Sequence, residues 1–168
     1  RSAIVGKTHM KPDVEGMRRL GVDINSTIGV HLSECGFEPF ERDDGLHPYG
    51  PYNPNPKYDD YLRSKGYNSQ NPWDDHANSG ISENGDRLSG WLLKNSNLAA
   101  DVDEEHSETP YMTQRAIDFM KEAGNQPWLC HLSYIKPHWP YIVPKPYNNM
   151  YNAKHIIPPI RDDEEKET

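Results

Sequence analysis

One helix and the strand that follows it constrain the fold more than any other part of the sequence. We expect a helix that is capped by Thr109, opens at Pro110 and ends at Gly124. Its apolar positions follow helical spacing: Met112, Ala116, Ile117 and Met120. Residues 128–135 then form a mostly apolar run without clean alternation, which is typical of a strand covered on both faces. A helix followed by such a strand is half of a βαβ unit, so the sequence predicts an α/β fold, a mostly parallel sheet flanked by helices.

The rest of the chain is less regular. Residues 2–6 favour a short buried strand that ends in a turn at Gly6, and residues 28–32 favour a second strand. A short helix is expected from Pro56 to near Gly66, with three residues on one face: Tyr58, Tyr61 and Leu62. Loop-forming residues dominate 38–56 and 67–108. We therefore expect one unit over 1–160 with a long loop-rich insertion near 38–108, followed by an acidic linker or loop over 161–168.

Composition excludes several classes of protein. The formal net charge of −8 argues against a nucleic-acid scaffold, which needs clustered basic residues. No apolar run approaches the roughly 18 residues of a membrane span. The two cysteines, Cys35 and Cys130, form no CxxC pair, so a disulfide scaffold or zinc ribbon is not expected. The sequence begins with Arg1 rather than Met, so we expect the true N-terminus to be absent, and nothing distinguishes a cytoplasmic from a periplasmic location.

Two polar clusters each follow a predicted strand directly. Lys7 and His9 lie two positions apart, so an extended segment would project both side chains to one face. His138 follows the second strand and stands between Pro137 and Pro140, which restrict the local backbone. An ammonium group beside imidazoles suits a tetrahedral oxyanion, and a rigid histidine can donate a proton to a leaving oxygen. The alternative is that each is an ordinary surface side chain.

These clusters match a known pattern. Ile4–Met10 resembles the Gly-Lys-x-His segment of the formylglycine-dependent sulfatases. Residues 127–151, with Ser133-Tyr134 leading into Pro137-His138-Trp139-Pro140, resemble the later strand of that family and its Pro-His-x-Pro turn. The family belongs to the alkaline-phosphatase-like superfamily, which also contains phosphonate monoester hydrolases and other phosphate ester hydrolases.

The resemblance implies a role for each of three catalytic residues. Lys7 would bind an oxygen of the sulfate or phosphate group together with the nucleophile. His9 would hydrogen-bond the hydrated formylglycine, and His138 would contact the transferring group and assist the leaving group. Some phosphonate-specific branches replace the first two residues. Retention of Lys7 and His9 therefore favours a small-molecule sulfate ester as the substrate, with a phosphonate or phosphate ester as the alternative.

Other parts of the family pattern do not occur in this sequence. Neither cysteine lies in a Cys-x-Pro-x-Arg motif, the source of formylglycine, and Asp162-Asp163 does not fit the Asp-His-Gly type of metal segment. We therefore expect the formylglycine and the ligands of a divalent metal, calcium by resemblance, to lie outside this chain, in the remainder of a parent enzyme. The chain alone is then expected to be an inactive central fragment of a catalytic domain. A rival interpretation is a non-catalytic module that binds a sulfated anion or glycan.

Several other features carry weaker hypotheses. Asp74-Asp75-His76 and Glu104-Glu105-His106 offer potential metal ligands but are interpreted as solvated loops, because adjacent side chains rarely converge on one ion. Asn25-Ser26-Thr27 fits the glycosylation acceptor pattern. His131 is interpreted as a hydrogen-bonded core histidine, and the tyrosines between 49 and 67 as aromatic packing rather than as a pocket wall.

Overall fold

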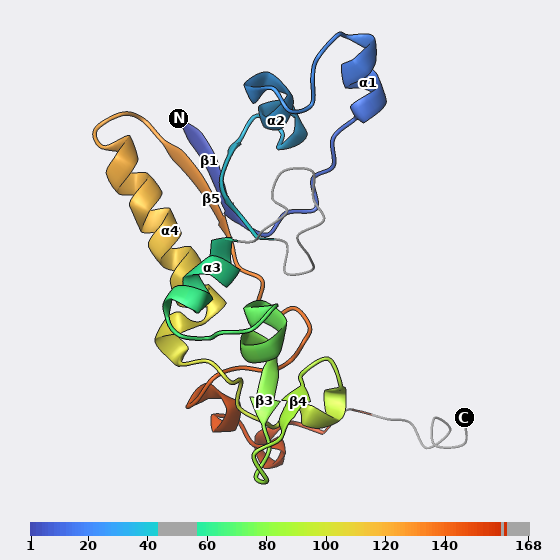
Figure 1. Ribbon diagram of the computed structural model, residues 1–168, viewed down its shortest axis with the longest axis vertical. Helices are drawn as coiled ribbons and strands as arrows, with labels where there is room; N and C mark the ends of the chain where they lie inside the picture. The colour runs from blue at the N-terminus through green and yellow to red at the C-terminus, as the bar shows by residue number, and fades with distance from the viewer. Residues whose placement is uncertain (44–56, 159, 161–168) are drawn as a thin grey trace.

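The larger of the two sheets in the described residues is parallel and has three strands. The structure is a computed structural model and describes residues 1–43, 57–158 and 160. The strands are β1 (Ser2–Gly6), β2 (Glu38–Arg42) and β5 (Leu129–Ser133), and they lie side by side in the order β2-β1-β5. Both pairings are parallel, with Gly6 opposite Arg42 on one side and opposite Ser133 on the other. Helix α4 (Glu108–Ala123) runs along this sheet and connects to β5 (Figure 1). The predicted α/β class, the parallel sheet and the helix-to-strand unit are confirmed.

The central strand is the best-buried part of the sheet. Ala3, Ile4 and Val5 are fully buried in β1, which has a paired strand on each side. β5 differs, because its side chains alternate between a packed and an open face. Cys130 and Leu132 pack against the core, whereas Leu129 and His131 are exposed. The expectations that this strand is covered on both faces and that His131 is a core residue are therefore wrong for the part of the chain the structure describes.

Helix α4 begins two residues earlier than predicted. Ser107 occupies the N-cap position and Glu108 is the first helical residue, while Gly124 ends the helix as expected with a φ of 58°. Of the predicted apolar face, Met112 and Ala116 are buried, but Ile117 and Met120 are 37% and 38% exposed. The core face instead continues through Phe119 and Ala123, the positions that helical geometry places above Met112 and Ala116.

The strand predicted over 28–32 is wrong, because those residues lie in helix α2 (Thr27–Ser33). Ser26, the central residue of the glycosylation pattern, is its N-cap, and the Ser26 hydroxyl accepts the Gly29 backbone N–H at 3.0 Å. Such a cap satisfies a donor that the first helical turn leaves unpaired, so a short apolar run becomes a helix. The preceding helix α1 (Val14–Arg19) is capped in the same way by Asp13.

The expected loop-rich insertion contains more regular structure than predicted. Glu38–Arg42 is strand β2 rather than loop, and α3 (Lys57–Ser64) confirms the short helix before Gly66. Beyond residue 67, a π-helical turn (Trp73–Ala77) precedes the antiparallel pair β3 (Ser79–Ile81) and β4 (Arg87–Ser89). Short 3-10 turns span Leu93–Asn95, Glu104–His106, Tyr147–Asn149 and Ala153–His155. The predicted loop over 44–56 and the predicted tail over 161–168 lie outside the described residues.

Aromatic side chains connect α3 to α4. The Tyr61 ring centroid lies 6.1 Å from that of Tyr58 and 4.8 Å from that of Tyr111 on α4. Tyr58 is 1% exposed, and its hydroxyl donates to the His106 carbonyl at 2.9 Å. The packing interpretation is therefore confirmed for the described tyrosines, whereas Tyr49 and Tyr52 lie outside the described residues. Within the described part of the chain, no helix combines the length and apolar character that crossing a membrane requires.

Gly6, at the end of β1, is expected to tolerate no side chain. Its φ is +99°, and a Cβ built there would clash with the carbonyl oxygen of Ser133. We expect Gly6→Ala to lower the free energy of unfolding by about 3 kcal/mol or more, because backbone strain and overpacking add. Gly85→Ala is the control, since Gly85 also has a positive φ (+86°) but open space around it, and should cost about 1 kcal/mol. Equal losses for the two variants in urea unfolding would contradict this account.

Candidate functional site

The carboxyl ends of the three parallel strands meet at one edge of the sheet. The Lys7 backbone N–H donates to the Ser133 carbonyl at 3.0 Å, which joins the segment after β1 to the end of β5. The Asp43 N–H donates to the Gly6 carbonyl at 3.1 Å and brings the residue after β2 to the same edge. The two polar clusters predicted from the sequence therefore follow adjacent strand ends. Open parallel sheets commonly bind ligands at such an edge.

Lys7 turns its ammonium group inward. Its Nζ atom is buried and has no hydrogen-bond partner among the described residues. Burying an ammonium group without hydrogen bonds costs free energy, so such a group is poised to bind an anion that supplies acceptors. Lys7 is also close enough to Glu108 to lower the pKa of that carboxyl group.

His9 lies in different surroundings from Lys7. The chain leaves the sheet at Gly6, the Thr8 hydroxyl accepts the Met10 N–H at 2.9 Å, and His9 is exposed to solvent. Arg42 at the end of β2 donates to the Thr8 carbonyl at 3.3 Å and forms an ion pair with Glu34. Arg42 thus attaches the Lys7–Met10 segment to the neighbouring strand.

The turn after β5 is held from both ends. The His138 N–H donates to the Ile135 carbonyl at 2.8 Å, and Lys136 Nζ donates to the Pro140 carbonyl at 2.8 Å. The His138 ring is exposed, and its Nδ1 lies 2.7 Å from the Trp139 carbonyl. Because a carbonyl oxygen only accepts, Nδ1 carries a hydrogen in this contact and Nε2 remains for a substrate.

A buried network of hydrogen bonds connects this turn to the rest of the fold. Lys136 Nζ donates to Asn78 Oδ1 at 3.1 Å, and Asn78 Nδ2 donates to the Trp73 carbonyl at 3.0 Å. The Trp73 indole N–H donates to Glu108 Oε1 at 2.7 Å. Asn78 is fully buried and Glu108 is 5% exposed. The network joins the π-helical turn, the first residue of α4 and the His138 turn.

Burial shifts the pKa of both ionisable groups of this network. Removal from water raises the pKa of the Glu108 carboxyl, against the opposing effects of Lys136, the Trp73 hydrogen bond and Lys7. The same cause lowers the pKa of Lys136, and the Glu108 charge opposes that shift. Glu108 is therefore the acidic group on which both lysines act, and it links the segment after β1 to the segment after β5.

Sequence reasoning missed most of this network. Lys136 carries no predicted role, and Glu108 falls in the predicted loop although it begins α4. Asn78 and Lys136 are 58 positions apart in the chain, so no local pattern connects them.

The two acidic triplets differ in their surroundings: Asp74-Asp75-His76 is packed into the fold, whereas Glu104 and Glu105 are exposed to solvent, as predicted, on a 3-10 turn. His76 is 8% exposed, its Nδ1 lies 2.9 Å from Asp101 Oδ2, and Asp74 Oδ1 accepts the Trp91 indole N–H at 2.7 Å. His106 is half-buried, and its Nδ1 lies 3.1 Å from the Tyr67 hydroxyl. In the ranges that the structure describes, no three His, Cys, Asp or Glu side chains are grouped to hold a metal ion. The described residues therefore form no ligand set for the divalent cation that the resemblance implies.

An open parallel sheet with charged side chains beyond its strand ends is an arrangement in which α/β folds bind ligands. No protein-family model matches the chain. Over 60 residues it is 35% identical to the multifunctional alkaline phosphatase superfamily protein PehA of Trinickia caryophylli, a match that covers 36% of this chain and 12% of that protein.

Two solved structures share the fold. The phosphonate monoester hydrolase SpPMH from Silicibacter pomeroyi matches 96% of this chain and 28% of its own, with a TM-score of 0.67 and 22% identity. The phosphonate monoester hydrolase of Agrobacterium radiobacter matches 90% of this chain over 26% of its own length, with a TM-score of 0.55 and 24% identity. The chain thus spans less than a third of each relative. The chain is therefore similar in part of its sequence to a protein of the alkaline phosphatase superfamily, and in fold to part of two larger hydrolases.

Proposed function

We propose that this chain supplies the anion-binding side of the active site of an ester hydrolase of the alkaline phosphatase superfamily. One observation carries the proposal: the buried, unpartnered Nζ of Lys7 lies at the sheet edge to which β5 delivers the His138 turn. An anionic tetrahedral group would give the Lys7 ammonium the acceptors it lacks.

Each of the three site residues has a distinct task in hydrolysis. The reaction breaks the bond between the transferring group and the alcohol oxygen, and water supplies an oxygen to the anion and a proton to the alcohol. Lys7 binds an oxygen of the anion and stabilises the charge that develops there. His138, held through Nδ1–H, donates a proton from Nε2 to the leaving oxygen when the ring is protonated. His9 acts on the nucleophile side of the group.

The nucleophile and the metal are proposed to come from segments outside these residues. A formylglycine would supply the attacking oxygen, and a divalent cation, calcium by resemblance, would polarise the oxygens of the anion. Because the described residues form no ligand set for the cation, this part of the proposal rests on the resemblance to sulfatases and on the partial span of the matches.

Two substrate classes remain in the proposal, and different observations favour them. Lys7 and His9 favour a sulfate monoester, because the resemblance implies that both residues belong to the sulfatase pattern. The similarity in fold to two phosphonate monoester hydrolases favours a phosphonate or phosphate ester. Both substrates present a tetrahedral anion with a leaving alcohol, so the same side chains serve either.

The test is steady-state hydrolysis by the intact protein that carries these residues. The substrates are p-nitrophenyl sulfate and p-nitrophenyl phenylphosphonate, and the preferred one identifies the class. We expect His138→Ala to lower kcat about 10²- to 10⁴-fold, the usual contribution of a general acid. His155→Ala removes another exposed histidine and should leave kcat unchanged.

Two results would overturn the proposal. One is an unchanged kcat in His138→Ala, and the other is turnover by a purified preparation of residues 1–168 alone. Tight binding of sulfated ligands without hydrolysis by the intact protein would favour the rival interpretation, a non-catalytic anion- or glycan-binding module.

A further inference from the structure

A cavity of about 220 Å³ lies beside the polar network. The N-terminal end of α4, the π-helical turn and the segment that follows the His138 turn enclose it. Most of its wall is hydrocarbon, from Ala77, Val102, Ile142, Val143 and Pro144. An apolar cavity of about 150 Å³ binds benzene, so this one has room for a substituted ring.

The charged residues of the wall are Lys136, Glu108 and Glu104. Glu104 is exposed to solvent, and its Oε1 lies 3.5 Å from the Tyr147 hydroxyl, so Lys136 and Glu108 are the charged groups of the buried part of the wall. Lys136 Nζ has three hydrogens and uses two of them, on Asn78 Oδ1 and the Pro140 carbonyl. Glu108 accepts the Trp73 indole N–H on Oε1, which leaves Oε2 as an acceptor. In the buried part of the cavity, a ligand therefore meets one N–H donor, from Lys136, and one carboxylate acceptor, from Glu108.

These two groups select the chemistry of the ligand. A second anion would be repelled by Glu108, and a cation would be repelled by Lys136. A hydroxyl group suits both, because it accepts from the ammonium group and donates to the carboxylate. The hydrocarbon wall favours an apolar body next to that hydroxyl. We propose that the cavity binds a neutral alcohol with a ring-sized hydrocarbon body.

The position of the cavity connects this ligand to the proposed reaction. Lys136 at one end of the His138 turn and Ile142 just beyond its other end both line the cavity. If the proposed function holds, on which this step rests, the ligand is the alcohol that hydrolysis of the ester releases. The substrates would then be esters of aryl or alicyclic alcohols rather than of sugars.

Binding is tested directly, without turnover, on the intact protein. Benzyl alcohol is titrated while the methyl NMR signals of Val102 and Val143 are followed. We expect those signals to shift, and Val143→Phe, which fills the cavity from a half-buried position, to weaken binding at least tenfold. Val30→Phe is the control, since Val30 is also half-buried but lies on α2, and it should leave the affinity unchanged.

The charged part of the wall is tested with a second variant and a second probe. Toluene has the size of benzyl alcohol without the hydroxyl. We expect Glu108→Gln to weaken benzyl alcohol about tenfold, the usual effect of losing a hydrogen bond to a charged group, and to leave toluene unchanged. Unchanged toluene binding also shows that the variant retains the cavity.

Any of three results would overturn the proposal. Benzyl alcohol leaves the methyl signals unshifted, or the protein binds benzyl alcohol no better than toluene. The third is that Val143→Phe binds benzyl alcohol as tightly as the unaltered protein does. A protein that binds benzyl alcohol as described but hydrolyses neither ester would sink the proposed function alone, so the two failures are distinguishable.

Discussion

Replacing Lys7 by methionine is expected to lower kcat/KM of the intact protein about 10²- to 10³-fold, the effect of removing one donor to a developing oxyanion. The fold should not suffer. Lys7 Nζ is buried and makes no hydrogen bond to the described residues, so a methionine of similar length removes a desolvated charge. The attraction to Glu108 that is lost with it is the weakest of the effects that act on that carboxyl group. We therefore expect Tm to remain the same or to rise while activity is lost.

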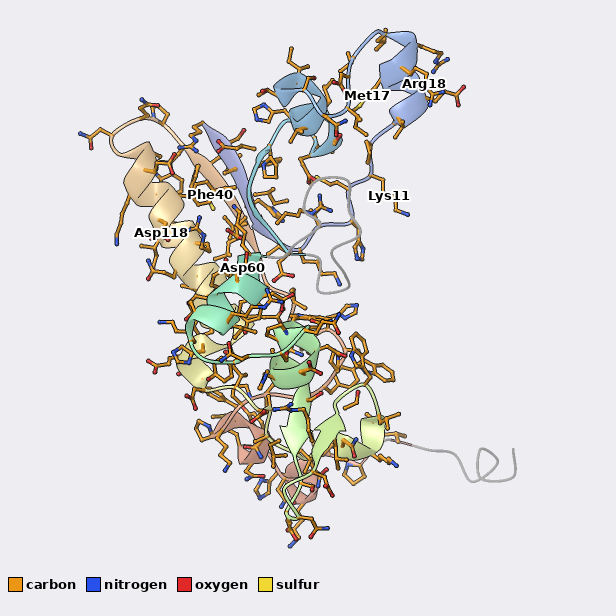
Figure 2. The ribbon with its side chains drawn as sticks, viewed as in Figure 1. Lys11, Met17, Arg18, Phe40, Asp60 and Asp118 are labelled. Atoms are coloured by element: carbon orange, nitrogen blue, oxygen red, sulfur yellow. The ribbon has the colours of Figure 1, made fainter. Side chains whose placement is uncertain are left out.

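Lys11→Met is the control for this prediction. Lys11 is exposed on the segment that leads from β1 to α1, as Figure 2 shows, and its loss should change neither activity nor Tm. Paired measurements of kcat/KM and thermal unfolding separate the two outcomes. A fall in Tm by several degrees in Lys7→Met, or activity equal to that of Lys11→Met, would remove Lys7 from the anion site.

Phe119→Ala is expected to destabilise the protein by about 3–5 kcal/mol, the usual cost of truncating a buried phenylalanine. Phe119 is fully buried on the face of α4 that covers the sheet. Its ring packs edge-on against Phe40 of β2 at 5.4 Å between centroids, and the Arg1 guanidinium lies 5.1 Å from its centroid. Truncation removes contacts to β2 and to the residue that precedes β1, and it leaves a cavity between helix and sheet.

The neighbouring residue provides a matched comparison. Met120 is 38% exposed, so Met120→Ala should cost less than about 1 kcal/mol because its side chain already contacts water. Urea unfolding followed by tryptophan fluorescence measures both variants. Equal losses would mean that Phe119 does not pack between α4 and the sheet as described.

The parts of the fold that were predicted correctly carry strong local signals. Helix α4 has helical spacing of its apolar residues and a glycine at its end, and β1 is a short apolar run that stops at Gly6. These patterns arise within a few residues, so the sequence shows them directly. The placement of the two polar clusters next to each other also follows from the sequence, because parallel neighbouring strands bring their carboxyl ends to the same edge of the sheet.

The failures have a different origin. Residues 28–32 are apolar enough for a strand, but the Ser26 cap begins a helix there. Strand β2 contains Pro39 and three charged residues, so its own sequence gives little indication of a strand. It forms because its backbone pairs with β1. The start of α4 was misplaced because Thr109 resembles a cap as closely as Ser107 does.

The candidate site was predictable only where it follows strands. Lys7, His9 and His138 were found because they come directly after β1 and β5, and their catalytic roles stay predictions. The supporting residues Asn78 and Glu108 come from distant segments that meet through tertiary packing. Such contacts depend on how the segments fold together, and no spacing in the sequence expresses them.

The place of β5 in the sheet has a consequence for handling the chain by itself. In the described residues β5 pairs with β1 along one side, and Leu129 is 58% exposed on its open face. A strand with an unpaired row of backbone groups and bare apolar side chains is a template on which a second molecule can add its own strand. A concentrated solution of these residues alone should therefore form soluble multimers or precipitate, which size-exclusion chromatography over a range of concentrations would detect.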